Sequence, residues 1–141
     1  MMNKQMHIQD QIVLVTGGAR GLGLAISRAL IAEGARVVVN YLNSAESAQI
    51  LATQHPQQVF IYQADVTNRE QVNALFSASL EHFGQHIHAV INNALVHFEF
   101  NGDARPKVEE LTWDHMQQQF DGAVKAALNT TQAALLGMKQ Q

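Results

Sequence analysis

Short apolar runs alternate with amphipathic stretches along the chain. The apolar runs predict four strands, over residues 12–15, 36–40, 59–63 and 87–91. Apolar residues at helical spacing predict three helices between these strands, over 24–33, 44–54 and 68–83, the third capped by Thr67 or Asn68. Beyond an irregular loop over 95–110, Thr112 is expected to cap a long helix that runs from Trp113 to Met138.

Strands that are apolar throughout, and that alternate with helices, indicate a parallel sheet covered on both faces. Right-handed crossovers place the second strand beside the first, the third outside the second, and the fourth on the other side of the first. The predicted fold class is α/β, a doubly wound parallel sheet of the Rossmann type in a single domain over 1–141. Its ligand site is expected between the first and fourth strands, at their carboxyl ends.

A glycine-rich segment, Thr16-Gly17-Gly18-Ala19-Arg20-Gly21-Leu22-Gly23, follows the first strand. Gly17 is expected to let the chain leave the strand sharply, and Gly21 to let the backbone approach a pyrophosphate. Gly23 is expected to let the next helix pack tightly, while the N-terminus of that helix presents N–H groups to an anion. The alternative is a tight turn that binds no ligand.

Composition excludes several classes of function. The 141 residues are 47% hydrophobic and 15% charged, as expected of a compact domain, and the formal net charge of −3 offers no basic surface for nucleic acid. The chain has no cysteine, and no apolar run approaches the length of a membrane span. Its seven histidines lack the convergent ligand set that a metal site needs. We therefore expect a cytoplasmic protein that binds no nucleic acid, no membrane and no metal.

Two further segments follow the glycine-rich one in order, Asp65-Val66 after the third strand and Asn92-Asn93-Ala94 after the fourth. In this combination the chain resembles the short-chain dehydrogenase/reductase family, in the branch that includes 3-oxoacyl-acyl-carrier-protein reductases. The resemblance extends from Asp10 to Lys139. It implies hydride transfer between a nicotinamide cofactor and the carbonyl or hydroxyl carbon of a small-molecule or acyl-thioester substrate.

The resemblance also implies contacts with the cofactor. The segment from Gly17 to Leu22 would cradle the pyrophosphate, Asp65 would bind the adenine amino group, and Val66 would pack on the adenine ring. Asn93 and Ala94 would lie along the ribose on the nicotinamide side. Alternatively, Asp65 is a cap or turn residue, and the asparagines are turn residues at a strand end. The candidate cofactor-binding residues are Gly17, Gly18, Ala19, Arg20, Gly21, Leu22, Gly23, Asn40, Tyr41, Asp65, Val66, Asn93 and Ala94.

The end of the second strand favours NADP(H) over NAD(H). NAD-selective sites carry an acid there for the ribose 2′-hydroxyl. Here the strand ends in Asn40-Tyr41, and the first acid is Glu46. Arg20 is placed to pair with a 2′-phosphate, for which its planar guanidinium is well suited, and Asn40 would add a neutral donor. The alternative for Arg20 is a solvated loop charge.

The chain departs from the family pattern in several places. Leu95 stands where the family has a glycine, and Ala123 stands where it has a catalytic helical asparagine. No tyrosine is followed by a lysine four residues later, and every serine precedes the fourth strand. We therefore expect a chain truncated before the fifth strand, with the catalytic serine and Tyr-x-x-x-Lys beyond residue 141 and no catalytic residue within it. In the family the helix from Trp113 to Met138 contributes to a homo-oligomer interface. The competing interpretation is a complete, non-catalytic dinucleotide-binding module.

Overall fold

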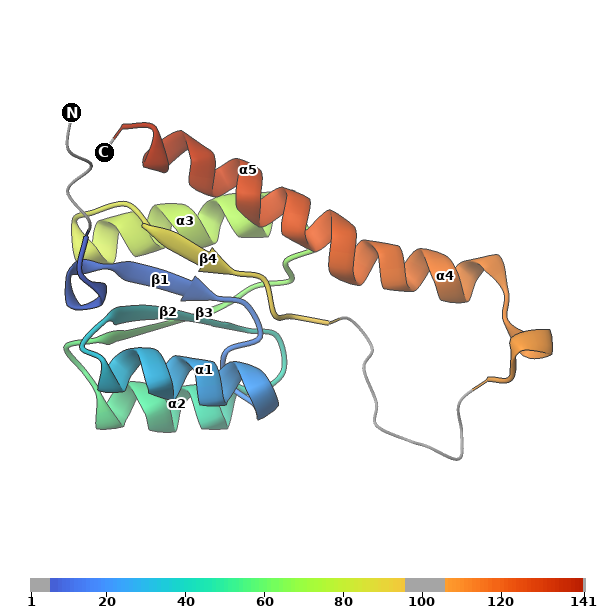
Figure 1. Ribbon diagram of the computed structural model, residues 1–141, viewed down its shortest axis with the longest axis horizontal. Coiled ribbons are helices and arrows are strands. Elements are labelled where there is room, and N and C mark those ends of the chain that lie inside the picture. Colours follow the sequence, from blue (N-terminus) through green and yellow to red (C-terminus); the bar gives the residue numbers. More distant parts are fainter. Residues whose placement is uncertain (1–5, 96–105, 141) are drawn as a thin grey trace.

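The computed structural model describes residues 6–95 and 106–140. At its centre is a parallel four-stranded sheet (Figure 1). Its strands are β1 (Ile12–Val15), β2 (Arg36–Tyr41), β3 (Val59–Gln63) and β4 (Ala89–Ile91). The strand order is β3-β2-β1-β4, and this confirms the predicted crossovers. All four strands run the same way, so their carboxyl ends meet along one edge of the sheet.

Helices cover both faces of the sheet, as the fold class predicts (Figure 1). Two of them, α1 (Gly21–Ala32) and α2 (Ala45–Gln54), lie on one face. The other face carries α3 (Arg69–Phe83) and α5 (Ala126–Met138). Two short 3-10 turns, η1 (Ile8–Asp10) and η2 (Val108–Glu110), lie outside these layers.

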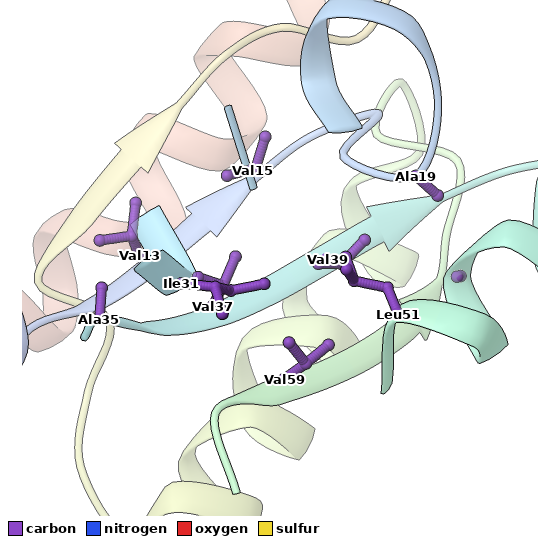
Figure 2. Packing of buried hydrophobic residues seen from close by; sticks show 10 residues of the cluster. Val13, Val15, Ala19, Ile31, Ala35, Val37, Val39, Leu51 and Val59 are labelled. Atoms are coloured by element: carbon purple, nitrogen blue, oxygen red, sulfur yellow. The ribbon is translucent and has the colours of Figure 1, made fainter. Parts of the chain in front are cut away.

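Alternate residues of each strand enter two separate hydrophobic clusters. Val13, Val15, Val37 and Val39 point toward α1 and α2, where they meet Ile31 and Leu51 (Figure 2). Ile12, Leu14 and Val38 point the opposite way and pack with Leu75 of α3. Both sets are almost fully buried, so every position of β1 is apolar.

Several element boundaries differ from the predicted ones. Helix α1 begins at Gly21, three residues earlier than expected, so the last glycines of the segment are already helical. Strand β4 begins at Ala89 rather than at residue 87. Of the two possible caps for α3, Asn68 is the one used, and its side chain accepts a hydrogen bond from the Gln71 N–H.

The predicted long helix is present from Trp113 to Met138 and is capped by Thr112, but it is not α-helical throughout. Helix α4 (Trp113–Phe120) is followed by a π-helical turn, η3 (Asp121–Lys125), before α5 begins. A π turn accommodates an extra residue within a helix. The apolar positions Met116, Phe120, Val124 and Leu128 are spaced by four rather than by the 3.6 residues of an α-helix. A wider turn between α4 and α5 fits that spacing.

Candidate functional site

The glycine-rich segment forms the turn between β1 and α1, at the carboxyl edge of the sheet. Gly17 has a φ of 62° and Gly21 a φ of 51°, both in the left-handed region that favours glycine. A Cβ on Gly17 would lie 3.2 Å from both the Ala94 Cα and the Asn93 Nδ2. The turn is therefore closely packed on the chain that follows β4, as expected for the crevice between β1 and β4.

Gly23 allows the closest backbone approach in the site. A Cβ there would lie 2.1 Å from the Gly17 carbonyl oxygen and 2.6 Å from the Asn93 Nδ2, too near for any side chain. The first turn of α1 thus rests directly on the glycine turn. Ser27, one turn further along α1, links the two parts, because its Oγ lies 3.0 Å from the Gly18 carbonyl and 2.9 Å from the Gly23 carbonyl and its single hydroxyl hydrogen is shared between them. The sequence pattern did not reveal this role of Ser27.

The outer side of the turn is open, in contrast to its inner side. No atom lies within 4 Å of the position that a Gly21 Cβ would take, and the Leu22 side chain is 71% exposed. Within the described part of the chain, no hydrogen bond uses the backbone N–H groups of residues 19–23 as donors. Arg20, the N-cap residue of α1, is exposed beside them. These N–H groups, the helix N-terminus and a guanidinium together form a cradle suited to an anion.

Thr16 and Asn93 join the ends of β1 and β4. The Thr16 Oγ1 accepts from the backbone N–H of Asn93 at 2.9 Å and from that of Ala94 at 3.0 Å. In return the Asn93 Nδ2 donates to the Thr16 carbonyl at 3.0 Å and to the Gly17 carbonyl at 3.3 Å. Asn93 and Ala94 therefore lie beside the glycine turn. Thr16, 2% exposed, is a site residue that the sequence analysis did not single out.

The position of Asn40 requires a correction. This side chain was expected to be a donor for a ribose phosphate, but it is 2% exposed and faces the protein. Its Nδ2 donates to the Ala64 carbonyl at 2.9 Å and to the Tyr62 carbonyl at 3.5 Å, so both amide hydrogens are directed to β3. Its Oδ1 accepts from the Gly17 N–H at 3.2 Å. Tyr41, the next residue, is partly buried and packs on the cluster between the sheet and its α1 and α2 layer.

Asp65 lies in a turn after β3. Its Oδ1 accepts from the Thr67 N–H at 2.9 Å and from the Thr67 Oγ1 at 2.7 Å, which confirms the alternative role of a turn residue. Both bonds use the same carboxylate oxygen, Oδ1. The Asp65 side chain is partly exposed.

Val66 requires a second correction. It was expected to pack on the adenine ring, but its side chain is 5% exposed and belongs to a cluster with Val72 and Ala126. The Val66 carbonyl accepts from the buried Asn129 Nδ2 at 3.1 Å. Ala123, at the position of the family's catalytic asparagine, lies in the π turn and is exposed. Because the Asn129 amide is committed to Val66, it does not take the place of that asparagine.

Two cavities lie away from the glycine turn. One, of about 130 Å³, lies between α3 and α5 and is lined by Leu80, His86 and Gly137, among others. Another is bordered by His86 and His88, just before β4 and hence at the amino edge of the sheet. Within residues 6–95 and 106–140 no three His, Asp or Glu side chains are grouped as metal ligands, and no helix is long and apolar enough to cross a membrane.

Comparison with known proteins agrees with this geometry. The short chain dehydrogenase family matches residues 11–141. An uncharacterised oxidoreductase of Methylorubrum extorquens is 35% identical over 130 residues, which are 90% of this chain and 50% of that protein. Human 15-hydroxyprostaglandin dehydrogenase [NAD(+)] is 30% identical, over 96% of this chain and 56% of its own length.

Solved structures show the same relationship. A Bacillus thuringiensis protein provisionally assigned as a 3-oxoacyl-reductase has a TM-score of 0.79 at 25% identity, with 93% of this chain and 53% of that one covered. A blue fluorescent protein from a metagenomic library, solved in complex with NADPH, has a TM-score of 0.79 at 26% identity and covers 94% of this chain and 53% of its own. The chain spans about half the length of these relatives. It belongs to the short-chain dehydrogenase/reductase family of oxidoreductases.

Proposed function

We propose that this protein is an NADP(H)-dependent reductase or dehydrogenase, and that the described chain is its dinucleotide-binding domain. The observation that carries the proposal is the open anion cradle at the start of α1, where a Cβ on Gly21 would meet no atom within 4 Å. The N–H groups of residues 19–23 would hold the pyrophosphate, with Asn93 and Ala94 on the nicotinamide side. The bound cofactor supplies or accepts a hydride.

The preference for NADP(H) rests on two features of the cofactor site. Arg20 is an exposed cation at the N-cap of α1, beside the cradle. The first carboxylate after β2 is Glu46, in the first turn of α2, so no acid at the strand end repels a 2′-phosphate. The relatives differ in their cofactors: the name of the human relative specifies NAD(+), and the metagenomic neighbour was solved with NADPH.

The substrate is proposed to be a carbonyl or hydroxyl compound, with a 3-oxoacyl thioester as the specific candidate. The support for the thioester is the name given to the Bacillus thuringiensis neighbour. Proton transfer to the substrate oxygen needs a positioned acid, and the 141-residue sequence contains no Tyr-x-x-x-Lys. In this proposal the catalytic serine, tyrosine and lysine lie outside these 141 residues. The protein is proposed to act in the cytoplasm. A non-catalytic dinucleotide-binding module is the competing function, and the same missing residues favour it.

An exposed apolar stripe supports a homo-oligomer. Trp113 is 70% exposed and Phe120 54% exposed on α4, and Val124 and Leu128 continue the stripe at 58% and 52%. Contiguous apolar surface of this kind is typical of protein interfaces. We propose that a second copy of the chain covers it. Sedimentation analysis is expected to show a dimer or larger assembly that Phe120→Lys dissociates, and a wild-type monomer contradicts the proposal.

Cofactor titration tests the proposed function. The wild-type protein is expected to bind NADPH more tightly than NADH, and Arg20→Ala to weaken NADPH by about tenfold, the effect of losing a charge-assisted hydrogen bond to phosphate. NADH affinity should change little. The control is Arg28→Ala, which removes another exposed arginine two turns along α1. Equal affinity for the two cofactors, or an unchanged preference in Arg20→Ala, contradicts the NADP(H) assignment.

A further inference from the structure

Asn40 is a buried polar residue of the site whose side chain makes three hydrogen bonds to backbone groups. It is the last but one residue of β2, between the glycine turn on one side and β3 on the other. Its side chain accepts from the Gly17 N–H and donates to the Ala64 carbonyl. Its backbone carbonyl accepts from the Gly18 N–H at 2.9 Å. One buried residue therefore holds the first two amides of the glycine turn and the last residue before Asp65.

These partners are located at two separate parts of the proposed cofactor site. Gly17 and Gly18 begin the turn whose outer N–H groups form the anion cradle. Ala64 directly precedes Asp65, the candidate contact for adenine. The amide of Asn40 thus links the glycine turn to the residue before Asp65 across the end of β2, in addition to the backbone pairing of β1, β2 and β3.

We propose that Asn40 is a positioning residue for dinucleotide binding, which sets the glycine turn and the Asp65 loop in register without touching the cofactor. This inference rests on the proposed function. The buried amide accepts from the Gly17 N–H and donates to the carbonyls of Ala64 and Tyr62. A side chain that can only accept, or only donate, leaves some of these backbone groups without a partner. Preorganisation of the site is then lost, and with it affinity for any ligand that spans both parts.

A positioning role of Asn40 can be distinguished by experiment from a role in selecting NADPH or NADH. A residue that reads the ribose changes the ratio of NADPH to NADH affinity when it is replaced. A positioning residue weakens both cofactors by the same factor, because pyrophosphate and adenine are common to the two. The decisive variant is Asn40→Asp, which keeps the acceptor for Gly17 but turns a carboxylate oxygen toward the Ala64 carbonyl. A selecting residue would shift preference to NADH on gaining this acid.

The chain supplies a matched control in Gln58. Its amide also ties two backbone carbonyls, those of Ile31 and Ala35, each at 3.0 Å. It precedes β3 and so lies at the amino edge of the sheet, away from the glycine turn. Gln58→Ala removes a comparable pair of hydrogen bonds without disturbing the proposed site.

The experiment is fluorescence titration of NADPH and NADH into wild-type protein, Asn40→Asp, Asn40→Ser and Gln58→Ala, each well below its own unfolding temperature. Both Asn40 variants are expected to lose about tenfold in affinity for both cofactors, with the NADPH-to-NADH ratio unchanged. Asn40→Ser, which keeps a small donor and acceptor, guards against a variant that does not fold. Gln58→Ala should bind like the wild type even where its thermal stability falls.

Each contrary result has a distinct meaning. Wild-type affinity in folded Asn40 variants, or a shift of Asn40→Asp toward NADH, overturns the positioning role and leaves the proposed function intact. An equal loss in Gln58→Ala also overturns it, because the effect is then one of general stability. Failure of the wild-type protein to bind either cofactor overturns the proposed function itself.

Discussion

Replacing Gly21 by valine separates cofactor binding from folding. Gly21 has a φ of 51°, and a Cβ there meets no atom within 4 Å, so a Cβ fits without a clash. The cost is backbone strain, which for a side chain in the left-handed region is about 1–2 kcal/mol. We expect the free energy of unfolding to fall by that amount while the helices and strands remain. The valine fills the open side of the cradle, and NADPH binding should be lost.

The matched control is Gly84→Val. Gly84 has a φ of 69°, likewise with no atom within 4 Å of its Cβ position, and it ends α3 at the amino edge of the sheet. Its strain should equal that of Gly21→Val, with no effect on the cradle. Urea unfolding followed by circular dichroism measures the stability of both variants, and fluorescence titration measures NADPH affinity. Normal NADPH binding by Gly21→Val refutes the reasoning, and so does an equal loss of binding in Gly84→Val.

Three further predictions concern the rest of the chain. Ser79 on α3 is fully buried and its hydroxyl has no hydrogen-bond partner in the described chain, so Ser79→Ala should raise the free energy of unfolding by about 1 kcal/mol in urea titration; a decrease contradicts this. Burial lowers the pKa of His88, and the nearby Arg36 and His86 add to the lowering. The His88 Nδ1 accepts from the Ile12 N–H at 2.9 Å and must stay unprotonated to do so. Stability should therefore be complete above about pH 6.5, the value for an unperturbed histidine, and fall as the pH drops toward the lowered pKa. Thermal unfolding from pH 7.5 to 5 should show this decline, reduced in His88→Asn, and a flat profile for the wild type contradicts it. Finally, the 141-residue chain should oxidise no NADPH with acetoacetyl thioesters or simple ketones, because it lacks a positioned acid worth roughly 10²–10⁴ in rate; steady turnover followed by absorbance contradicts this.

The sheet order was predictable because each apolar run is short, buried on both faces and separated by one helix. Handedness then leaves one arrangement of the first four strands, and the structure has it. The position of the glycine turn followed from the same reasoning. Local signals were enough wherever the relevant contacts lie within one strand–helix unit.

Asn40 and Val66 were misread for a physical reason. Asn40 lies near the end of β2 and Val66 in the turn after β3, where a side chain faces either solvent or protein, and a single sequence does not show which. The partners of Asn40 are Gly17, 23 residues before it, and Ala64, 24 residues after it. Val66 is drawn into a cluster by Ala126, which comes from a helix sixty residues further on. Such contacts are decided by tertiary packing.

The π turn at Asp121–Lys125 had a signal that the helical pattern concealed. Apolar residues spaced by four were read as one amphipathic helix, although a uniform α-helix would rotate them progressively around its axis. The regular spacing from Met116 to Leu128 agrees with the wider turn that the structure has.

The central claim, that the glycine turn and the ends of β3 and β4 bind a nicotinamide dinucleotide, is tested most directly by NMR spectroscopy of the backbone amides during NADPH titration. The account predicts saturable shifts that are largest for residues 19–23, with a second group at Asp65 and a third at Asn93 and Ala94. Amides around His86 and Gly137, beside the cavity between α3 and α5, should not move. Shifts confined to that cavity, or no saturable shift at the glycine turn, contradict the account.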